Sequence, residues 1–406
     1  MRIITIKENS GYALPENEVP FFKEFLESNK DLPVTLNGNT LIFEAYIVGS
    51  ITVKNTSIVI EPRISKFTPN HYFEMQLFNE GLLNNDLSSL LSENEGFGIQ
   101  ENLISLFLQE TFELVVEGVE GAFLKVQEKS GTVKGKILIE EISPLDLMQG
   151  VVPVEYEIHT RSTSFNKIIK LALMKLPSII SREKQNKLHS LVSAYFENID
   201  VAPSDLPVLL LENEYKLYYE NSRYPTVIGL AKKILNDLKL NMKNSEVLGI
   251  AYLVNSNSLF ENYVRKVLSL GLKTSVTKWA APKNMGQFVH QGVPYIKSYI
   301  PDILLDYRTD SNVALAVLDA KNKDISNPQH IGSLADLYQI LFYSYSLNST
   351  FGGLVYPCYG DYRATRISIE SFKESNIFAF FVDFEKSIKN RNDDFIKQIK
   401  STFRIE

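Results

Sequence analysis

Two aspartates and one lysine in the last third of the chain have the types and spacing needed to hydrolyse a phosphodiester bond. Asp302 follows Pro301, and Asp319 and Lys321 lie two positions apart in Asp319-Ala320-Lys321. Mg²⁺ prefers hard oxygen ligands, and in nucleotide and phosphate chemistry it often takes one or two carboxylates. A lysine beside the ion can orient the attacking water or stabilise charge on the phosphate. The three residues therefore predict metal-dependent phosphodiester hydrolysis.

The segments around these residues predict two neighbouring strands. Ile303–Leu305 and Ala316–Leu318 are apolar and β-rich, and the turn at Thr309–Asn312 lies between them. Side chains two positions apart on a strand point to the same face. Asp319 and Lys321 are therefore expected to share one face at a strand end.

The helices on either side of these strands carry further candidates. Gln339 and Tyr343 are four residues apart in a helix expected near 334–347, so they share a face that we expect to look toward the site and contact the DNA backbone. Glu261 lies in a helix expected near 259–270. It is either an additional metal ligand or a glutamate favoured by the helix dipole in the first turn, and the sequence leaves both open.

Composition limits the class of protein. The chain has 406 residues, which predicts two or three domains, and its one cysteine excludes a disulfide framework. The net charge of −6 argues against a free-standing DNA-binding protein, because phosphate affinity comes from lysine and arginine. The chain starts without a signal peptide and has no apolar run long enough to span a bilayer, so a cytoplasmic protein without membrane contact is expected.

The hydrophobic pattern predicts an α+β chain with several domains. A β-rich region with some helices is expected over residues 1–130, a mainly helical connecting region over 131–245, and a C-terminal α/β domain over 246–406. The segment from Gly131 to Lys136 is one residue too short for a phosphate-binding loop, and Ile137 stands where that loop needs a hydroxyl residue. The chain is therefore not expected to hydrolyse GTP by itself.

The motifs resemble a known nuclease superfamily. Pro301-Asp302, Asp319-Ala320-Lys321 and the Gln339 to Tyr343 spacing are similar to the PD-(D/E)xK nucleases and to the QxxxY element of their RecB-like branch. The wider sequence resembles the McrC family, the nuclease subunit of McrBC-type restriction systems. The segments that carry this wider resemblance are Glu61-Pro62-Arg63-Ile64, Val133 to Ile137, Phe165 to Ile169, Leu259 to Val264, Asp336 to Gln339 and Leu354 to Pro357.

The resemblance implies a Mg²⁺-dependent DNA endonuclease subunit with a PD-(D/E)xK core at 246–406. Asp302 and Asp319 would bind the metal, Lys321 would complete the catalytic set, and Gln339 and Tyr343 would support it or contact DNA. The implied partners are double-stranded DNA and an McrB-like AAA+ GTPase ring, which uses the GTP. The β-rich region at 1–130 would dock on that ring and stimulate hydrolysis. Lys134 departs from the family, which usually carries arginine before this glycine.

Two other functions remain open at this point. The chain could be a catalytically inert activator or assembly subunit of an AAA+ ring, although the intact Asp302, Asp319 and Lys321 argue against decay. It could also be a stand-alone RecB-like repair nuclease, which the acidic net charge disfavours.

Overall fold

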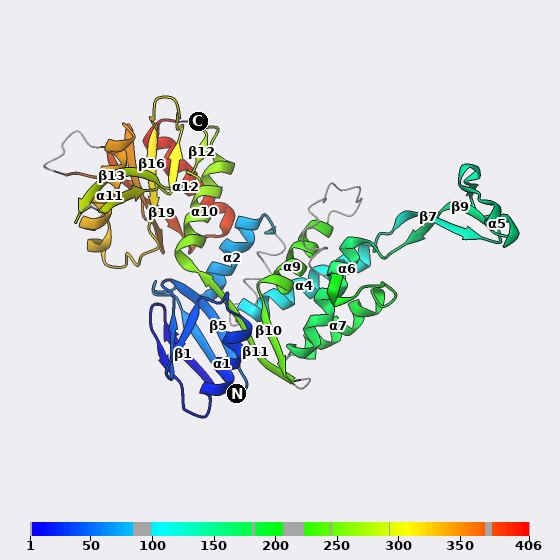
Figure 1. The fold of residues 1–406 in the computed structure, drawn as a ribbon. Coiled ribbons are helices and arrows are strands. Elements are labelled where there is room, and N and C mark those ends of the chain that lie inside the picture. Colours follow the sequence, from blue (N-terminus) through cyan, green and yellow to red (C-terminus); the bar gives the residue numbers. More distant parts are fainter. Residues whose placement is uncertain are drawn as a thin grey trace. The chain divides into compact units, whose positions relative to one another are not determined.

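The computed structural model describes residues 2–83, 99–180, 183–205, 223–243, 246–291, 293–369 and 376–405. The chain is a mixture of helices and strands, as the sequence predicts (Figure 1). It forms two compact units, one made of Met1–Ile99 with Leu248–Glu406 and the other of Gln100–Val247. The unit boundaries therefore follow residues 99 and 247, whereas the sequence placed divisions after 130 and 245.

The N-terminal part of the first unit contains a sheet with the strand order β1-β6-β5-β11. In it, β1 runs parallel to β6, and the other neighbours are antiparallel. Apolar side chains of these strands, such as Ile51 and Ile58, pack against Phe22 and Phe25 of the first helix. The elements are β1 (Arg2–Lys7), β2 (Tyr12–Ala13), α1 (Val19–Ser28), β3 (Val34–Asn37), β4 (Thr40–Phe43), β5 (Ile47–Val53), β6 (Thr56–Glu61), α2 (Pro69–Glu80) and β11 (Glu246–Asn255).

The second unit combines helices with a small antiparallel sheet of order β7-β9-β8. Gly135 enters this sheet with φ +62°, and a Cβ there would collide with the Glu155 carbonyl oxygen, so only glycine fits. Beside it, the Lys134 ammonium pairs with Glu128 at 3.2 Å. The elements are α4 (Ile99–Glu117), β7 (Ala122–Ser130), β8 (Lys136–Ile137), η1 (Ile139–Glu141), α5 (Pro144–Met148), β9 (Val152–Thr160), α6 (Ser164–Lys175), η2 (Leu176–Ser178), α7 (Glu183–Tyr195), η3 (Pro203–Asp205), α9 (Tyr224–Asn236) and β10 (Lys239–Lys243).

The C-terminal part of the first unit contains a six-stranded sheet with the order β12-β15-β16-β17-β19-β18. The two pairs β16–β17 and β17–β19 are parallel, and the remaining neighbours are antiparallel. The elements are α10 (Ser256–Gly271), β12 (Val276–Thr277), β13 (Lys283–His290), β14 (Val293–Tyr299), β15 (Ile303–Leu305), β16 (Ala316–Ala320), η4 (Pro328–His330), α11 (Leu334–Ser346), β17 (Phe351–Cys358), β18 (Thr365–Ile367), β19 (Ile377–Asp383) and α12 (Ile388–Phe403).

Both faces of this sheet are buried, which explains the unbroken apolar runs in its strands. Ile303 and Leu318 point to the face covered by α10 and α12. Leu304 and Val317 point to the opposite face, where they pack with Ile340 of α11. Because side chains alternate along a strand, Asp302 and Asp319 are expected on the α11 face as well. None of the helices in the described part of the chain is long and apolar enough to cross a bilayer.

Candidate active site

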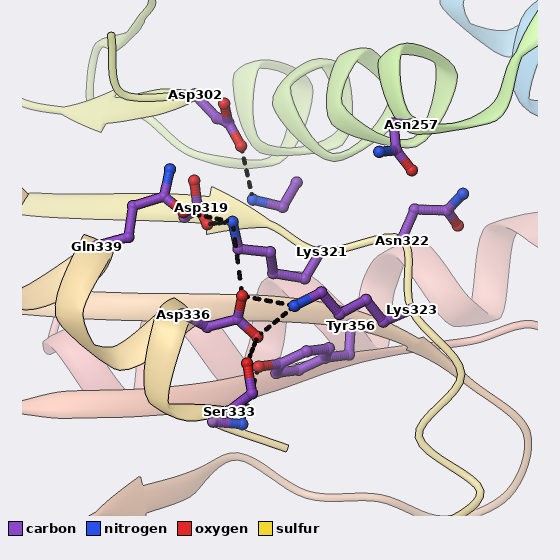
Figure 2. A network of polar contacts seen from close by, with 12 residues as sticks. Asn257, Asp302, Asp319, Lys321, Asn322, Lys323, Ser333, Asp336, Gln339 and Tyr356 are labelled. Atoms are coloured by element: carbon purple, nitrogen blue, oxygen red, sulfur yellow. Dashed lines mark hydrogen bonds and ion pairs between the residues drawn. The ribbon is translucent and has the colours of Figure 1, made fainter. Parts of the chain in front are cut away.

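The pairing of β15 with β16 determines where the two aspartates lie. These strands are antiparallel, with Ile303 opposite Leu318, so Asp302 before β15 comes opposite Asp319 near the end of β16. The backbone N–H of Ala320 donates a hydrogen bond to Asp302 Oδ2 at 3.0 Å (Figure 2). The register thus brings together two carboxylates that are 17 positions apart in the sequence.

The two carboxylates lie in an environment that favours a cation between them. Burial raises the pKa of Asp302 to about 8, and the neighbouring carboxylates of Asp319 and Glu261 add to the rise. Asp319 is only 1% exposed. Its Oδ2 forms an ion pair with Lys321, but no well-aligned hydrogen bond reaches this oxygen from the described residues. A hard divalent cation fits this donor set, because it would neutralise both carboxylates and satisfy the buried oxygen.

Lys321 is held between Asp319 and the first turns of α11. Its Nζ pairs with Asp319 and donates a hydrogen bond to Gln339 Oε1 at 2.8 Å. Gln339 Nε2 in turn donates to Tyr343 Oη at 2.9 Å, and Tyr343 Oη donates to the Ile300 carbonyl at 3.3 Å. Burial lowers the pKa of the Lys321 ammonium, but the nearby carboxylates, above all Asp319, outweigh burial and leave it raised. Lys321 therefore carries a positive charge at neutral pH.

Asp336 belongs to the same network, although sequence reasoning did not select it as a site residue. It is 3% exposed, and both its oxygens accept hydrogen bonds from Lys323 Nζ, at 2.6 and 2.8 Å. Ser333 Oγ donates to it at 2.7 Å, and Lys321 Nζ lies 3.8 Å away. The sequence could have indicated Asp336 by its spacing, because it lies three residues before Gln339 and both side chains therefore share one face of α11.

Glu261 lies near the two aspartates but pairs with basic side chains. It forms an ion pair with Lys278, and Arg265 Nη1 lies 3.7 Å from its Oε1. No group of three or more metal-binding side chains is found among the residues that the structure describes. The pair Asp302 and Asp319 has a number of carboxylates that suits Mg²⁺ with water and phosphate as remaining ligands, and metal binding by Glu261 stays a prediction.

The structure thus brings together the five main candidates, Asp302, Asp319, Lys321, Gln339 and Tyr343, on the α11 face of the sheet (Figure 2 labels four of them). Their chemical roles remain predictions.

Comparison with known proteins identifies the family. The model of the McrBC 5-methylcytosine restriction system component matches residues 44–357, which is more than half of the chain. The chain belongs to the McrBC family. No curated protein matches it.

Two solved structures resemble this McrBC family member. A chain in the Thermococcus gammatolerans assembly of McrB AAA+ hexamers with bound McrC has a TM-score of 0.66 and 18% identity, over 98% of this chain and 99% of that chain. A chain of the Thermococcus gammatolerans McrBC complex has a TM-score of 0.47 and 17% identity, over 66% of this chain and 88% of that chain. The first comparison shows that the two chains have the same fold over nearly their whole length, and at 18% identity it shows the fold alone.

Proposed function

We propose that this McrBC family member is the DNA endonuclease subunit of a GTP-dependent restriction complex. Under this proposal, its C-terminal sheet is a PD-(D/E)xK core that hydrolyses phosphodiester bonds with Mg²⁺. The observation that carries the proposal is the convergence of Asp302 and Asp319 with the Lys321 ammonium at the paired ends of β15 and β16. When bound, Mg²⁺ supplies polarisation of a phosphate oxygen and makes a water acidic enough to attack near neutral pH.

The residues of the chain have separate tasks in this reaction. Asp302 and Asp319 would hold the metal through their carboxylate oxygens, whose spacing is set by the register of β15 and β16. Lys321 presents its positive charge to the phosphate, where negative charge builds up as water attacks. Gln339 accepts a hydrogen bond from Lys321 and is itself fixed by Tyr343, so α11 orients the ammonium.

We also propose an AAA+ GTPase ring as the partner. The similar chain of known structure comes from an assembly of McrB AAA+ hexamers with bound McrC, and the likeness covers almost all of both chains. The acidic net charge of −6 supports a division of labour, because a partner would then supply much of the affinity for double-stranded DNA. GTP would be used by that partner and not by this chain.

The test is a DNA cleavage assay with the chain, its AAA+ partner, GTP and Mg²⁺. Asp319→Asn and Lys321→Met are expected to lower cleavage by at least about 1,000-fold, a loss typical of essential charged groups, while stimulation of the GTPase persists. Cleavage at the wild-type rate in both variants would remove the proposed site. GTPase stimulation by a wild-type chain that never cuts DNA would instead favour the inert activator, and cutting by the purified chain alone would favour a stand-alone nuclease.

A further inference from the structure

A half-buried arginine outside the C-terminal sheet reaches the backbone immediately after Lys321. Arg63 follows β6 in the N-terminal part of the first unit. Its Nε donates a hydrogen bond to the Asn322 carbonyl at 3.2 Å, and its Nη2 donates to the same oxygen. Nη2 also donates to Asn257 Oδ1 at 2.8 Å. One guanidinium therefore joins α10 and the loop after β16.

The surroundings of Arg63 form a polar cluster that holds it in place. Glu8 is 5% exposed, accepts a hydrogen bond from the backbone N–H of Arg63 at 3.0 Å, and accepts another from Ser256 Oγ at 2.5 Å. The guanidinium lies 4.4 Å from the centroid of the Tyr46 ring. Because its position is determined from several sides, Arg63 can act as a fixed support for the loop that it touches.

The loop itself is held at several consecutive positions. Asn322 is 2% exposed, and its side-chain Nδ2 donates to Tyr72 Oη at 3.2 Å. The backbone N–H of Ser65 donates to Asp324 Oδ2 at 3.0 Å. The segment 63–65 therefore lies along the segment 322–324 and fixes it by both backbone and side-chain contacts.

The backbone of Lys321 is held from two sides. On one side, the backbone N–H of Lys321 donates to the Val355 carbonyl of β17 at 2.8 Å. On the other side, the peptide group of Asn322 is held by Arg63. In Figure 2, Lys321 extends from this strand end toward Asp319, while the Asn322 side chain points away from Lys321. Removing the support on the Asn322 side would let the backbone of Lys321 move.

We propose that Arg63 is a positioning residue of the active site, which fixes the backbone after Lys321 and thereby aims its ammonium at the reacting phosphate. The inference rests on the proposed nuclease function. The contacts of Arg63 with Asn322 and of Ser65 with Asp324 also join the N-terminal part to the C-terminal sheet within one compact unit. A displacement of about 1 Å in a catalytic group can cost about 100-fold in rate, so the expected effect is large.

Arginine suits this task better than lysine. Its planar guanidinium donates two hydrogen bonds to one carbonyl and a third to Asn257, whereas a lysine ammonium is a compact charge on a flexible stem. Arg63→Met removes all these donors at similar length, and Arg63→Lys keeps the charge. Arg63→Lys is therefore expected to recover part of the activity that Arg63→Met loses.

Arg391 provides a matched control. It is a buried arginine of the same unit, 2% exposed in its side chain, and it pairs with Glu74 at 2.6 Å and donates to Tyr263 Oη at 2.8 Å. These contacts join α12 to α2 and α10 and include none of the site residues. Arg391→Met, or Arg391→Lys if the former does not fold, should reduce thermal stability without a specific effect on the site.

The experiment measures single-turnover DNA cleavage by the chain with its AAA+ partner, GTP and Mg²⁺, together with hydrogen–deuterium exchange of the peptide covering 321–327. Arg63→Met should lower the cleavage rate about 10- to 100-fold at unchanged KM for DNA, and exchange in this peptide should rise. GTPase stimulation should persist. If Arg63→Met does not fold, Asn257→Ala, which removes one acceptor of the guanidinium, should slow cleavage about 2- to 10-fold.

Three results are decisive. Cleavage and exchange at wild-type levels in Arg63→Met would overturn the proposal. Equal losses in the Arg63 and Arg391 variants, in step with their thermal stability, would also overturn it, because the role would then be structural only. A wild-type chain that does not cleave DNA would contradict the proposed function instead, and exchange of the 321–327 peptide would still decide whether Arg63 fixes the loop.

Discussion

Replacing Asp302 by asparagine should stabilise the protein when no metal is present. Burial and the adjacent carboxylates raise the pKa of Asp302 from 3.8 to about 8. At neutral pH the unfolded chain has this carboxyl ionised, so folding must either bury the charge or take up a proton, and both cost free energy. A pKa difference of one between the folded and unfolded chain corresponds to about 1.4 kcal/mol, so the raised pKa corresponds to a loss on the order of 5 kcal/mol in the free energy of unfolding at pH 8. Structural relaxation and entry of water around the carboxylate reduce this loss. For Asp302→Asn we therefore expect a gain on the order of 2 kcal/mol in the free energy of unfolding. Asparagine can still accept the Ala320 hydrogen bond.

The sign of the pH dependence follows from the raised pKa. The protonated Asp302 carboxyl contributes to the stability of the folded chain. This contribution is fully present below about pH 4 and is lost as the pH rises through about 8, the pKa in the folded chain. The advantage of Asp302→Asn should therefore be largest near pH 8 and vanish near pH 4. Mg²⁺ should reverse the order, because it stabilises the wild-type pair of carboxylates and not the variant.

The assay is thermal denaturation at several pH values in EDTA and in Mg²⁺. Asp306→Asn is the matched control, because Asp306 lies just beyond the other end of β15 and its side chain is 47% exposed. The control should melt with the wild type in both buffers. If Asp302→Asn melts at or below the wild-type temperature in EDTA at pH 8, the reasoning about a buried and uncompensated pair of carboxylates is wrong.

Three further predictions concern other residues of the same sheet and helix. Asp336→Asn should slow cleavage about 10-fold at similar DNA affinity, because Lys323 and Lys321 lose a buried counter-charge. Steady-state kinetics with the AAA+ partner measures the rate, and an unchanged rate would contradict the prediction. Tyr343→Phe removes one hydrogen bond to Gln339, so a loss of only about 2- to 10-fold is expected, and a complete loss would point to a direct catalytic role. Gly353→Ala should lower the free energy of unfolding by about 1–3 kcal/mol, since a Cβ at this position would collide with Leu318 Cδ2. Urea titrations measure this free energy, and an unchanged midpoint would refute the prediction.

Much of the candidate site was readable from the sequence because it depends on local rules. The alternation of side chains along a strand placed Asp319 and Lys321 on one face, and the four-residue spacing placed Gln339 and Tyr343 together on α11. The turn between the two strands was enough to predict that Asp302 lies near Asp319, and β15 and β16 do pair in antiparallel register. The proximity of these residues could therefore be inferred from the sequence alone.

Contacts between distant segments could not be predicted from these rules. Arg63 and Asn322 are 259 positions apart, and nothing in their local sequences indicates that they meet. The boundary at Ile99 was not predicted either, because the helical pattern of α4 does not show which unit it packs in. The compact first unit combines the two ends of the chain, which periodicity cannot reveal, since it reports only on the burial of each element by itself.

Metal binding by the two aspartates can be measured in a crystal structure of the wild-type chain soaked with Mn²⁺, in which the ion is located by its anomalous signal. We expect one strong peak within bonding distance of carboxylate oxygens of both Asp302 and Asp319, with Lys321 Nζ beside it. A peak elsewhere, or none between these two carboxylates in a preparation that cleaves DNA with Mn²⁺, would contradict this expectation.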